Sequence, residues 1–150
     1  PDREQNPKFG QKLDFIDRMT RWSEAVACPT IMVGDFNVAP EDRDVHDPAA
    51  WIGSVHVSPE ERAALKTIMD VGFVDAFRHF EQPERSFSWW DYRQGAFRRN
   101  NGLRIDLILV HQKLVPRLVS CRIDVEPRRV ERASDHTPVI ATFMGTSLVS

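Results

Sequence analysis

Residues 31–37 read Ile-Met-Val-Gly-Asp-Phe-Asn, a short apolar run followed at once by polar side chains. The apolar run predicts a short buried strand, and Gly34 allows the backbone to turn sharply where that strand ends. Asp35 and Asn37 then lie at the carboxyl end of the strand, which is where open α/β sheets bind their ligands. A carboxylate and a carboxamide in this position favour a metal-assisted reaction on a phosphate group. The alternative is a strand followed by an ordinary Asx turn.

The chain has 150 residues, which is enough for one domain with its own apolar core. It contains no apolar run of about 18 residues and no signal-peptide pattern, so we expect a cytoplasmic protein. The net charge is only −2, but the two halves differ. Residues 1–77 carry 8 Lys and Arg against 14 Asp and Glu, whereas residues 78–150 carry 12 against 8. Since 11 of those 12 cations are arginines, we expect any polyanionic partner to bind the second half.

Two segments carry helix signals. Residues 9–27 place apolar side chains on two adjacent stripes, so we expect an amphipathic helix that is covered over a wide arc and ends before Pro29. Ser58 is placed as the N-cap of a second helix, followed by a proline and, at the capping-box position, by Glu61. This second helix is expected to end at Gly72.

Apolar runs and alternating patterns predict the strands. We expect a second buried strand at residues 103–110, and further strands at residues 86–93, 118–125 and 138–143. Residues 73–77 could form either a short strand or one more helical turn. Residues 38–57 form a loop of about 20 residues, which is longer than a compact domain usually contains without a functional role.

Asp106 is the one ionisable residue in the middle of the strand predicted at residues 103–110. A buried carboxylate is costly unless a charged or hydrogen-bonding partner compensates it, so we expect an Arg or His beside it. The alternative is a purely structural aspartate that pairs with Arg104 or Arg93.

Asp135 and His136 stand on a tight turn closed by Pro138, directly before a predicted strand. An imidazole held at the edge of a sheet in this way can reach a ligand, although an Asp-His dipeptide alone is a weak signal. Together with Asp35 and Asp106, the Asp135-His136 pair suggests a histidine that is oriented by a buried aspartate and lies beside a carboxylate that can activate water. With a metal ion to offset phosphate charge, this is the arrangement of a phosphodiester-hydrolysis site.

Four motifs carry a family resemblance: Gly34-Asp-Phe-Asn37, Trp89-Trp-Asp-Tyr-Arg93, Gly102-Leu-Arg-Ile-Asp106 and Ser134-Asp-His136. They resemble the endonuclease/exonuclease/phosphatase superfamily, and specifically its exodeoxyribonuclease III branch of apurinic/apyrimidinic (AP) endonucleases. The first and last motifs alone would also admit the DNase I, sphingomyelinase and inositol-phosphatase branches. The two central motifs are far more specific to the DNA-repair branch. The resemblance extends from about Lys8 to Phe143.

The resemblance implies a role for each matching residue. Asp35 would activate or orient the attacking water, and Asn37 would bind the phosphate. Asp106 would orient His136, which would contact the scissile phosphate, and Asp135 would lie on the metal side of the site. Three residues are implied in DNA binding: Trp89, packed against the deoxyribose of an abasic site, and Arg93 and Asn100, in a loop that approaches DNA. We expect Trp90 to lie in the core, because neighbours on a strand face opposite sides.

The resemblance is also incomplete. The first half of the family domain supplies a metal-binding glutamate, an asparagine and a tyrosine, and none of these has a counterpart here. Residues 1–150 therefore resemble the carboxyl-terminal half of a single domain whose amino-terminal half is absent. The implied fold is half of a four-layer α/β sandwich of the DNase I type, with a mixed sheet and helices on its outer face. Its inner face, lined by residues 31–33 and 105–110, would be bare, so we expect pairing with the missing half or a homodimer.

The implied activity of the parent protein is cleavage of DNA 5′ of abasic sites, together with 3′-to-5′ exonuclease activity on duplex DNA, using Mg²⁺ or Mn²⁺. We do not expect catalysis from this chain alone. Two alternatives stay open: a phosphoesterase of the same superfamily that acts on a lipid or inositol phosphate, and a non-catalytic DNA-binding remnant.

Overall fold

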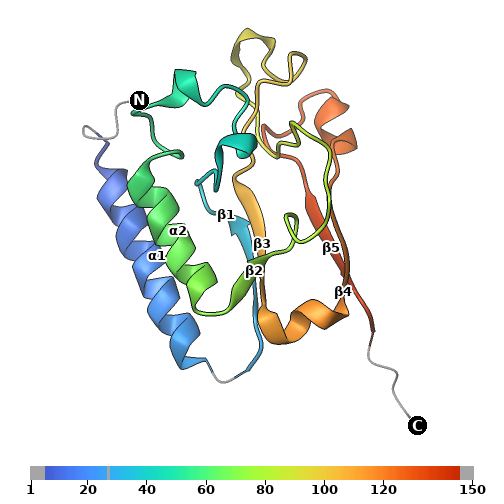
Figure 1. Ribbon diagram of the computed structural model, residues 1–150. Coiled ribbons are helices and arrows are strands. Elements are labelled where there is room, and N and C mark those ends of the chain that lie inside the picture. The colour runs from blue at the N-terminus through green and yellow to red at the C-terminus, as the bar shows by residue number, and fades with distance from the viewer. Residues whose placement is uncertain (1–5, 27, 146–150) are drawn as a thin grey trace.

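The computed structural model describes residues 6–26 and 28–145 and arranges them in layers of helix and sheet (Figure 1). The helices and strands, in chain order, are α1 (Lys8–Ala25), β1 (Ile31–Asp35), α2 (Pro59–Asp70), β2 (Phe73–Asp75), β3 (Asp106–His111), β4 (Leu118–Ile123) and β5 (Val139–Phe143). Short 3₁₀ helices interrupt the connections: η2 (Asp42–Asp44), η3 (Ala49–Trp51), η4 (Arg93–Gly95), η5 (Gln112–Arg117) and η6 (Glu126–Arg129). No helix in this described part of the chain is long and apolar enough to cross a membrane.

The start and end of α2 follow from its sequence. The Ser58 side chain accepts a hydrogen bond from the backbone N–H of Glu61, and the Glu61 carboxylate accepts one from the backbone N–H of Ser58. This reciprocal pair is the predicted capping box. Gly72 follows the helix with a left-handed φ of +107° and donates its N–H to the carbonyl of Met69. Both predicted boundaries of this helix are therefore confirmed.

Three strands form one sheet in the order β1-β3-β2, and β4 pairs with β5 in a second. Both neighbours of β3 run antiparallel to it, and β4 and β5 are also antiparallel. The strands that the structure describes thus form no mixed sheet, contrary to our expectation. Residues 73–75 form a strand, and the strands predicted near residues 118–125 and 138–143 are present.

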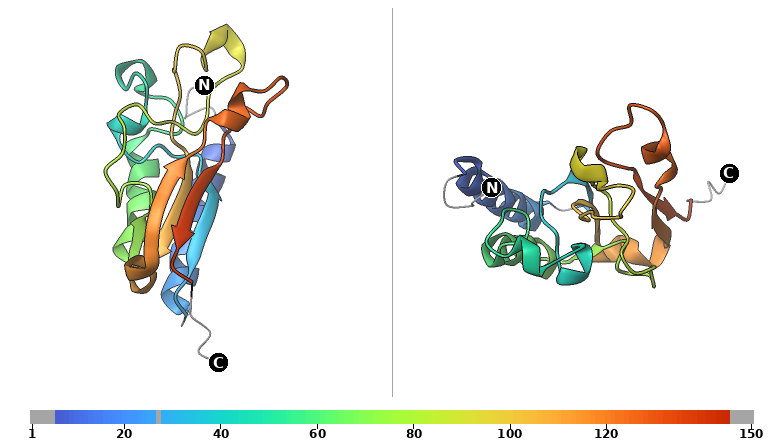
Figure 2. Two further views of the ribbon diagram at one scale, coloured as in Figure 1. Left: turned by 90° about the vertical axis from the view of Figure 1, so that its right-hand side faces the viewer. Right: turned by 90° about the horizontal axis from the view of Figure 1, so that it is seen from above.

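Each face of the central sheet has its own apolar core. On one face, Met32 of β1 and Leu107 and Leu109 of β3 pack against Ile16 of α1 and Leu65 of α2. On the other face, β3 is covered by the β4–β5 hairpin. Figure 2 shows the helices and the hairpin on opposite sides of β3.

The hairpin does not cover β1, so this strand is buried on one face only. Val33 has 68% of its surface exposed and Ile31 has 39%, although Met32 between them is buried. On α1, Phe15 and Trp22 are exposed as well, whereas Met19 of the same stripe packs against the core. Of the inner face that we expected to be bare, only the β1 part is open, because residues 105–110 are covered by the hairpin and neighbouring segments.

Residues 86–93 are all described and form no strand, although their pattern predicted one. Trp89 instead forms isolated bridges with Leu103 and with His136. Trp90 turns into a separate cluster with Phe87 and is 2% exposed, as predicted for a core residue. The segment thus pairs with two different partners and not with one long strand, and its burial does not alternate, because Phe87 and Ser88 are both buried.

Candidate active site

The site lies where β1 ends and β3 begins. In the antiparallel register of these strands, Asp35 is paired with Asp106. Asp106 is the first residue of β3 and not a buried residue in the middle of a strand, and its side chain is 19% exposed. The predicted position in the middle of a strand was wrong, because the strand starts three residues later than expected, and the side chain is partly buried. The end of one strand and the start of the next bring two carboxylates to the same edge of the sheet.

His136 reaches this edge from the turn before β5. Its Nδ1 lies 2.9 Å from Oδ2 of Asp106 and 3.1 Å from Oδ1, and its Nε2 lies 3.9 Å from Oδ2 of Asp35. The turn is held in place because the N–H of Thr137 donates to the carbonyl of Ser88. With Nδ1 occupied by one carboxylate, the ring presents Nε2 towards the other.

The partner of Asp106 is a histidine, and neither arginine considered as an alternative contacts it. Arg104 is 1% exposed and bonds to Asp44 and Asp75. Arg93 bonds to Asp91.

Asp35 and Asn37 form a closed Asx turn. The backbone N–H of Asn37 donates to Oδ1 of Asp35, and its side-chain amide donates to Oδ2, each at 2.8 Å. The pKa of Asp35 is raised above its ordinary value, mainly because burial removes water from the carboxylate; the Asn37 N–H opposes this shift and the nearby charge of Asp106 adds to it. A carboxylate with a raised pKa is a better proton acceptor, which suits a group that activates water.

Asp135 faces Trp89. The indole Nε1 of Trp89 donates to Oδ2 of Asp135 at 3.0 Å, and the backbone N–H of Trp90 donates to the Asp135 carbonyl. Within residues 6–26 and 28–145, no three or more His, Cys, Asp or Glu side chains are grouped so that they could hold a metal ion. The described residues, Asp135 among them, therefore do not make a complete set of metal ligands.

Arg93 and Asn100, the two other predicted DNA-binding residues, differ in their surroundings. The Arg93 side chain is 85% exposed, and its guanidinium lowers the pKa of Asp91 to about 2 through hydrogen bonds. Asn100 uses its side chain inside the loop, accepting from Trp90 Nε1 at 3.1 Å and donating to the carbonyl of Arg85 at 3.0 Å. The Arg93 guanidinium is thus exposed and paired with Asp91, whereas Asn100 shapes the loop.

A pocket of about 300 Å³ lies beside Trp89. It is lined by His46, Trp51, Trp89, Asp91, Arg93, Gln94, Ala96, Arg99 and Asn101. Two aromatic indoles and two guanidinium groups are suited to stacking on a base or sugar and to pairing with phosphate. His46, Trp51 and Arg99 were not predicted as site residues, because they are brought to Trp89 by two long loops.

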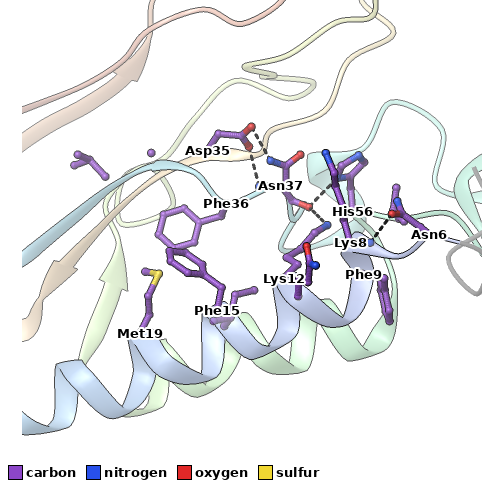
Figure 3. A pocket seen from close by; sticks show the side chains of 15 residues that line it. Asn6, Lys8, Phe9, Lys12, Phe15, Met19, Asp35, Phe36, Asn37 and His56 are labelled. Carbon is purple, nitrogen blue, oxygen red and sulfur yellow. Dashed lines mark hydrogen bonds between the residues drawn. The ribbon is translucent and has the colours of Figure 1, made fainter.

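A larger pocket of about 770 Å³ runs between α1 and the end of β1 (Figure 3). Asp35 and Asn37 line it together with Lys12 and His56, which were not predicted as site residues either. Lys12 lies within a helical pattern and gave no signal, and His56 is one of several polar residues in a long loop. Only the fold places them next to Asn37.

Comparison with known proteins gives consistent matches. The model of the endonuclease/exonuclease/phosphatase family matches residues 18–136. The exodeoxyribonuclease III of Haemophilus influenzae is 36% identical over 151 residues, which cover 94% of this chain and 57% of that protein. An exodeoxyribonuclease of Bacillus subtilis is 35% identical, covering 89% and 55% of the two chains.

Solved structures match equally well. An AP endonuclease from Archaeoglobus fulgidus superposes with a TM-score of 0.86 at 37% identity, covering 92% of this chain and 55% of that one. A 3′ phosphatase from Neisseria, bound to a product DNA hairpin, gives 0.89 at 35% identity, covering 94% and 56%. The predicted α/β fold of the DNase I type is confirmed by these matches. The chain spans about half the length of the relatives it matches.

Proposed function

Because this chain belongs to the exodeoxyribonuclease III and AP endonuclease branch of the endonuclease/exonuclease/phosphatase family, we propose that it carries the histidine side of a DNA-repair phosphodiesterase site. The complete protein would cut DNA 5′ of an abasic site and remove nucleotides from 3′ ends of duplex DNA. The observation that carries the proposal is the row of Asp106, His136 and Asp35, with Nδ1 of the imidazole on one carboxylate and Nε2 facing the other.

In the proposed reaction, a water oxygen attacks the phosphorus and the bond to the 3′ oxygen of the preceding nucleotide breaks. Asp35 takes the proton from the water, and the raised pKa of this carboxyl supports that role. His136, whose Nδ1–H is held by Asp106, acts as the imidazolium and donates from Nε2–H to a phosphate oxygen as negative charge develops there. Asn37 donates a further hydrogen bond to the phosphate. The leaving oxygen takes up a proton from solvent.

A divalent cation, Mg²⁺ or Mn²⁺, would offset the charge of the phosphate when bound. Asp135 is the residue of this chain that we assign to it. Since the described residues do not complete a set of metal ligands, we propose that the other ligands come from the part of the family domain that has no counterpart in this chain.

The DNA-binding surface in this proposal is the loop region around Trp89. Trp89 packs against the deoxyribose, and Arg93 pairs with the phosphate backbone. The exposed guanidinium of Arg93 and the pocket beside Trp89 support this assignment. Asn100 holds the loop in shape through Trp90 and Arg85.

The open edge at β1 marks the place where we propose that the domain is completed. Residues 1–150 would be the carboxyl-terminal half, and the amino-terminal half would cover Val33 and the exposed side chains of Phe15 and Trp22 on α1. Without that half, two copies of the chain would associate through the same surface. The exposed apolar side chains of Ile31, Val33, Phe15 and Trp22 support either pairing.

A nicking assay tests the proposal. The substrate is a labelled duplex with one abasic site, with Mg²⁺ present and an EDTA control. We expect no cleavage by this chain alone, and metal-dependent cleavage 5′ of the abasic site when an amino-terminal half from a relative is added. Cleavage by the chain alone would contradict the division into halves. Failure of the completed domain to cut DNA, with hydrolysis of an inositol phosphate instead, would contradict the substrate class.

A further inference from the structure

Glu61 is a buried charge that the proposed chemistry does not use. Its side chain is fully buried at the start of α2, and it forms an ion pair with Lys12 of α1. It also accepts hydrogen bonds from the backbone N–H of His56 at 3.1 Å and from Ser58. Burial alone would raise the pKa of Glu61, but these hydrogen bonds, led by that of Lys12, outweigh it and lower the pKa. The carboxylate therefore stays ionised and anchors two separate segments.

Both of those segments donate to one atom, the carbonyl oxygen of Asn37. Nζ of Lys12 lies 2.9 Å from this oxygen, and Nδ1 of His56 lies 2.7 Å from it. Figure 3 shows Lys12 and His56 converging on Asn37 from the helix and from the loop. A carbonyl oxygen has two lone pairs, and here both are used by side chains that Glu61 holds in place.

The backbone at this point needs such support. Asn37 has a φ of +54° and His56 a φ of +79°, so both lie in the left-handed region that side chains other than glycine rarely adopt. The conformation of Asn37 directs its backbone N–H and its side-chain amide to the two oxygens of Asp35. The N–H and the carbonyl of Asn37 belong to adjacent peptide groups joined at its Cα. By holding the carbonyl, Lys12 and His56 therefore fix the Asn37 conformation on which the orientation of the Asp35 carboxylate depends.

We propose that Lys12, fixed by Glu61 and acting with His56, is a positioning residue that holds the Asn37 carbonyl and thereby sets the orientation of Asp35 and Asn37 in the site. The structural part of this proposal stands on the contacts alone. Its catalytic consequence rests on the proposed function, since it requires that Asp35 and Asn37 act on a phosphate.

The test is amide hydrogen exchange of the 150-residue chain, measured by NMR, for Lys12→Met. Lys66→Met is the matched control, because Lys66 is exposed on α2 and, among the described residues, pairs with Asp70 at the surface. We expect exchange of the Asn37 amide to become at least about tenfold faster in Lys12→Met, while amides in β3 keep their wild-type rates. Lys12→Arg retains a donor and a charge and should restore slow exchange.

Two outcomes would overturn the proposal. The first is an unchanged exchange rate of the Asn37 amide in Lys12→Met. The second is an equal increase in the exchange rates of the Asn37 and β3 amides, which would mean a loss of overall stability only. If Lys12→Met is too unstable, Lys12→Met combined with Glu61→Gln removes the unpaired buried charge and keeps an acceptor for the Ser58 cap. In the completed, active domain, Lys12→Met should lower kcat with little change in KM. An inactive wild-type domain would contradict the proposed function, and the exchange result would still decide this inference.

Discussion

His136 and Asp106 are 30 positions apart in the chain, yet Nδ1 of the imidazole lies 2.9 Å from Oδ2 of the carboxylate. The contact forms because the turn before β5 and the start of β3 are tied to a common segment, residues 88–89. Ser88 accepts from the N–H of Thr137 through its carbonyl and from the N–H of Asp106 through its hydroxyl. A segment without regular structure therefore sets the geometry of the proposed site.

His136→Ala is expected to abolish most of the activity of a completed domain. Each preorganised donor to a developing charge is worth about 3 kcal/mol of barrier, so turnover should fall about a hundredfold or more. DNA binding should stay nearly unchanged, because other residues would make the contacts to the phosphate backbone. Single-turnover kinetics and a binding titration separate the two effects. A loss below about tenfold would reduce His136 to a structural role.

Asp35→Asn is expected to stabilise the fold at neutral pH. Burial raises the pKa of Asp35 in the folded state above its ordinary value of 3.8. The full stability of the fold is therefore present at low pH, where this carboxyl is protonated in both states. Part of that stability is lost as pH rises through the raised pKa. An amide cannot ionise and avoids that loss. Urea unfolding should therefore give a higher midpoint for the variant at about pH 7, with the difference shrinking towards about pH 3. Asp14→Asn, at an exposed surface pair, serves as the control. A lower midpoint for Asp35→Asn at neutral pH would contradict the prediction.

Arg104→Met is expected to destabilise the protein strongly. The Arg104 guanidinium is buried between Asp44 and Asp75, and removing it leaves two carboxylates with fewer partners. Breaking a buried ion pair in this way typically costs about 3–5 kcal/mol. Arg122→Met, at an exposed pair with Asp124, should cost less than about 0.5 kcal/mol. Equal unfolding free energies for the two variants would show that the buried pairs contribute nothing.

Val33→Lys is expected to reduce self-association of the chain. Val33 lies on the free edge strand of the sheet and is 68% exposed, and a lysine on such an edge opposes pairing with another chain. Val119→Lys, on the exposed side of β4, is the matched control. Sedimentation velocity at several concentrations should show the wild type and the control associating and Val33→Lys as a monomer. A wild-type chain that is monomeric at every concentration would rule out the homodimer.

Local signals predicted the helices and most strands. The Ser58 capping box and Gly72 set the ends of α2 because the atoms involved are a few residues apart. Prediction failed for residues 86–93, where the aromatic alternation indicates alternating burial but does not specify one partner strand. It also failed for Phe15, since apolar character does not say whether another layer is present to cover a side chain.

For the candidate site, the sequence indicated Asp35, Asn37, Asp106, Asp135 and His136 through their motifs and their positions next to predicted strands. Their roles remain predictions. Lys12 and Glu61 gave no such signal, because their contacts are long-range. Lys12 bonds to Asn37 across 25 positions and to Glu61 across 49 positions.

The sequence by itself determined the family, the capped helix and the residues that could carry chemistry, since these depend on short-range spacing and residue type. The resemblance already implied that Asp106 orients His136. Tertiary structure alone decided that Arg104 pairs with Asp44 and not with Asp106, and that Lys12 and His56 share the carbonyl of Asn37. Such pairings depend on the paths of the long loops and on strand register, which interactions between residues close in the sequence do not specify.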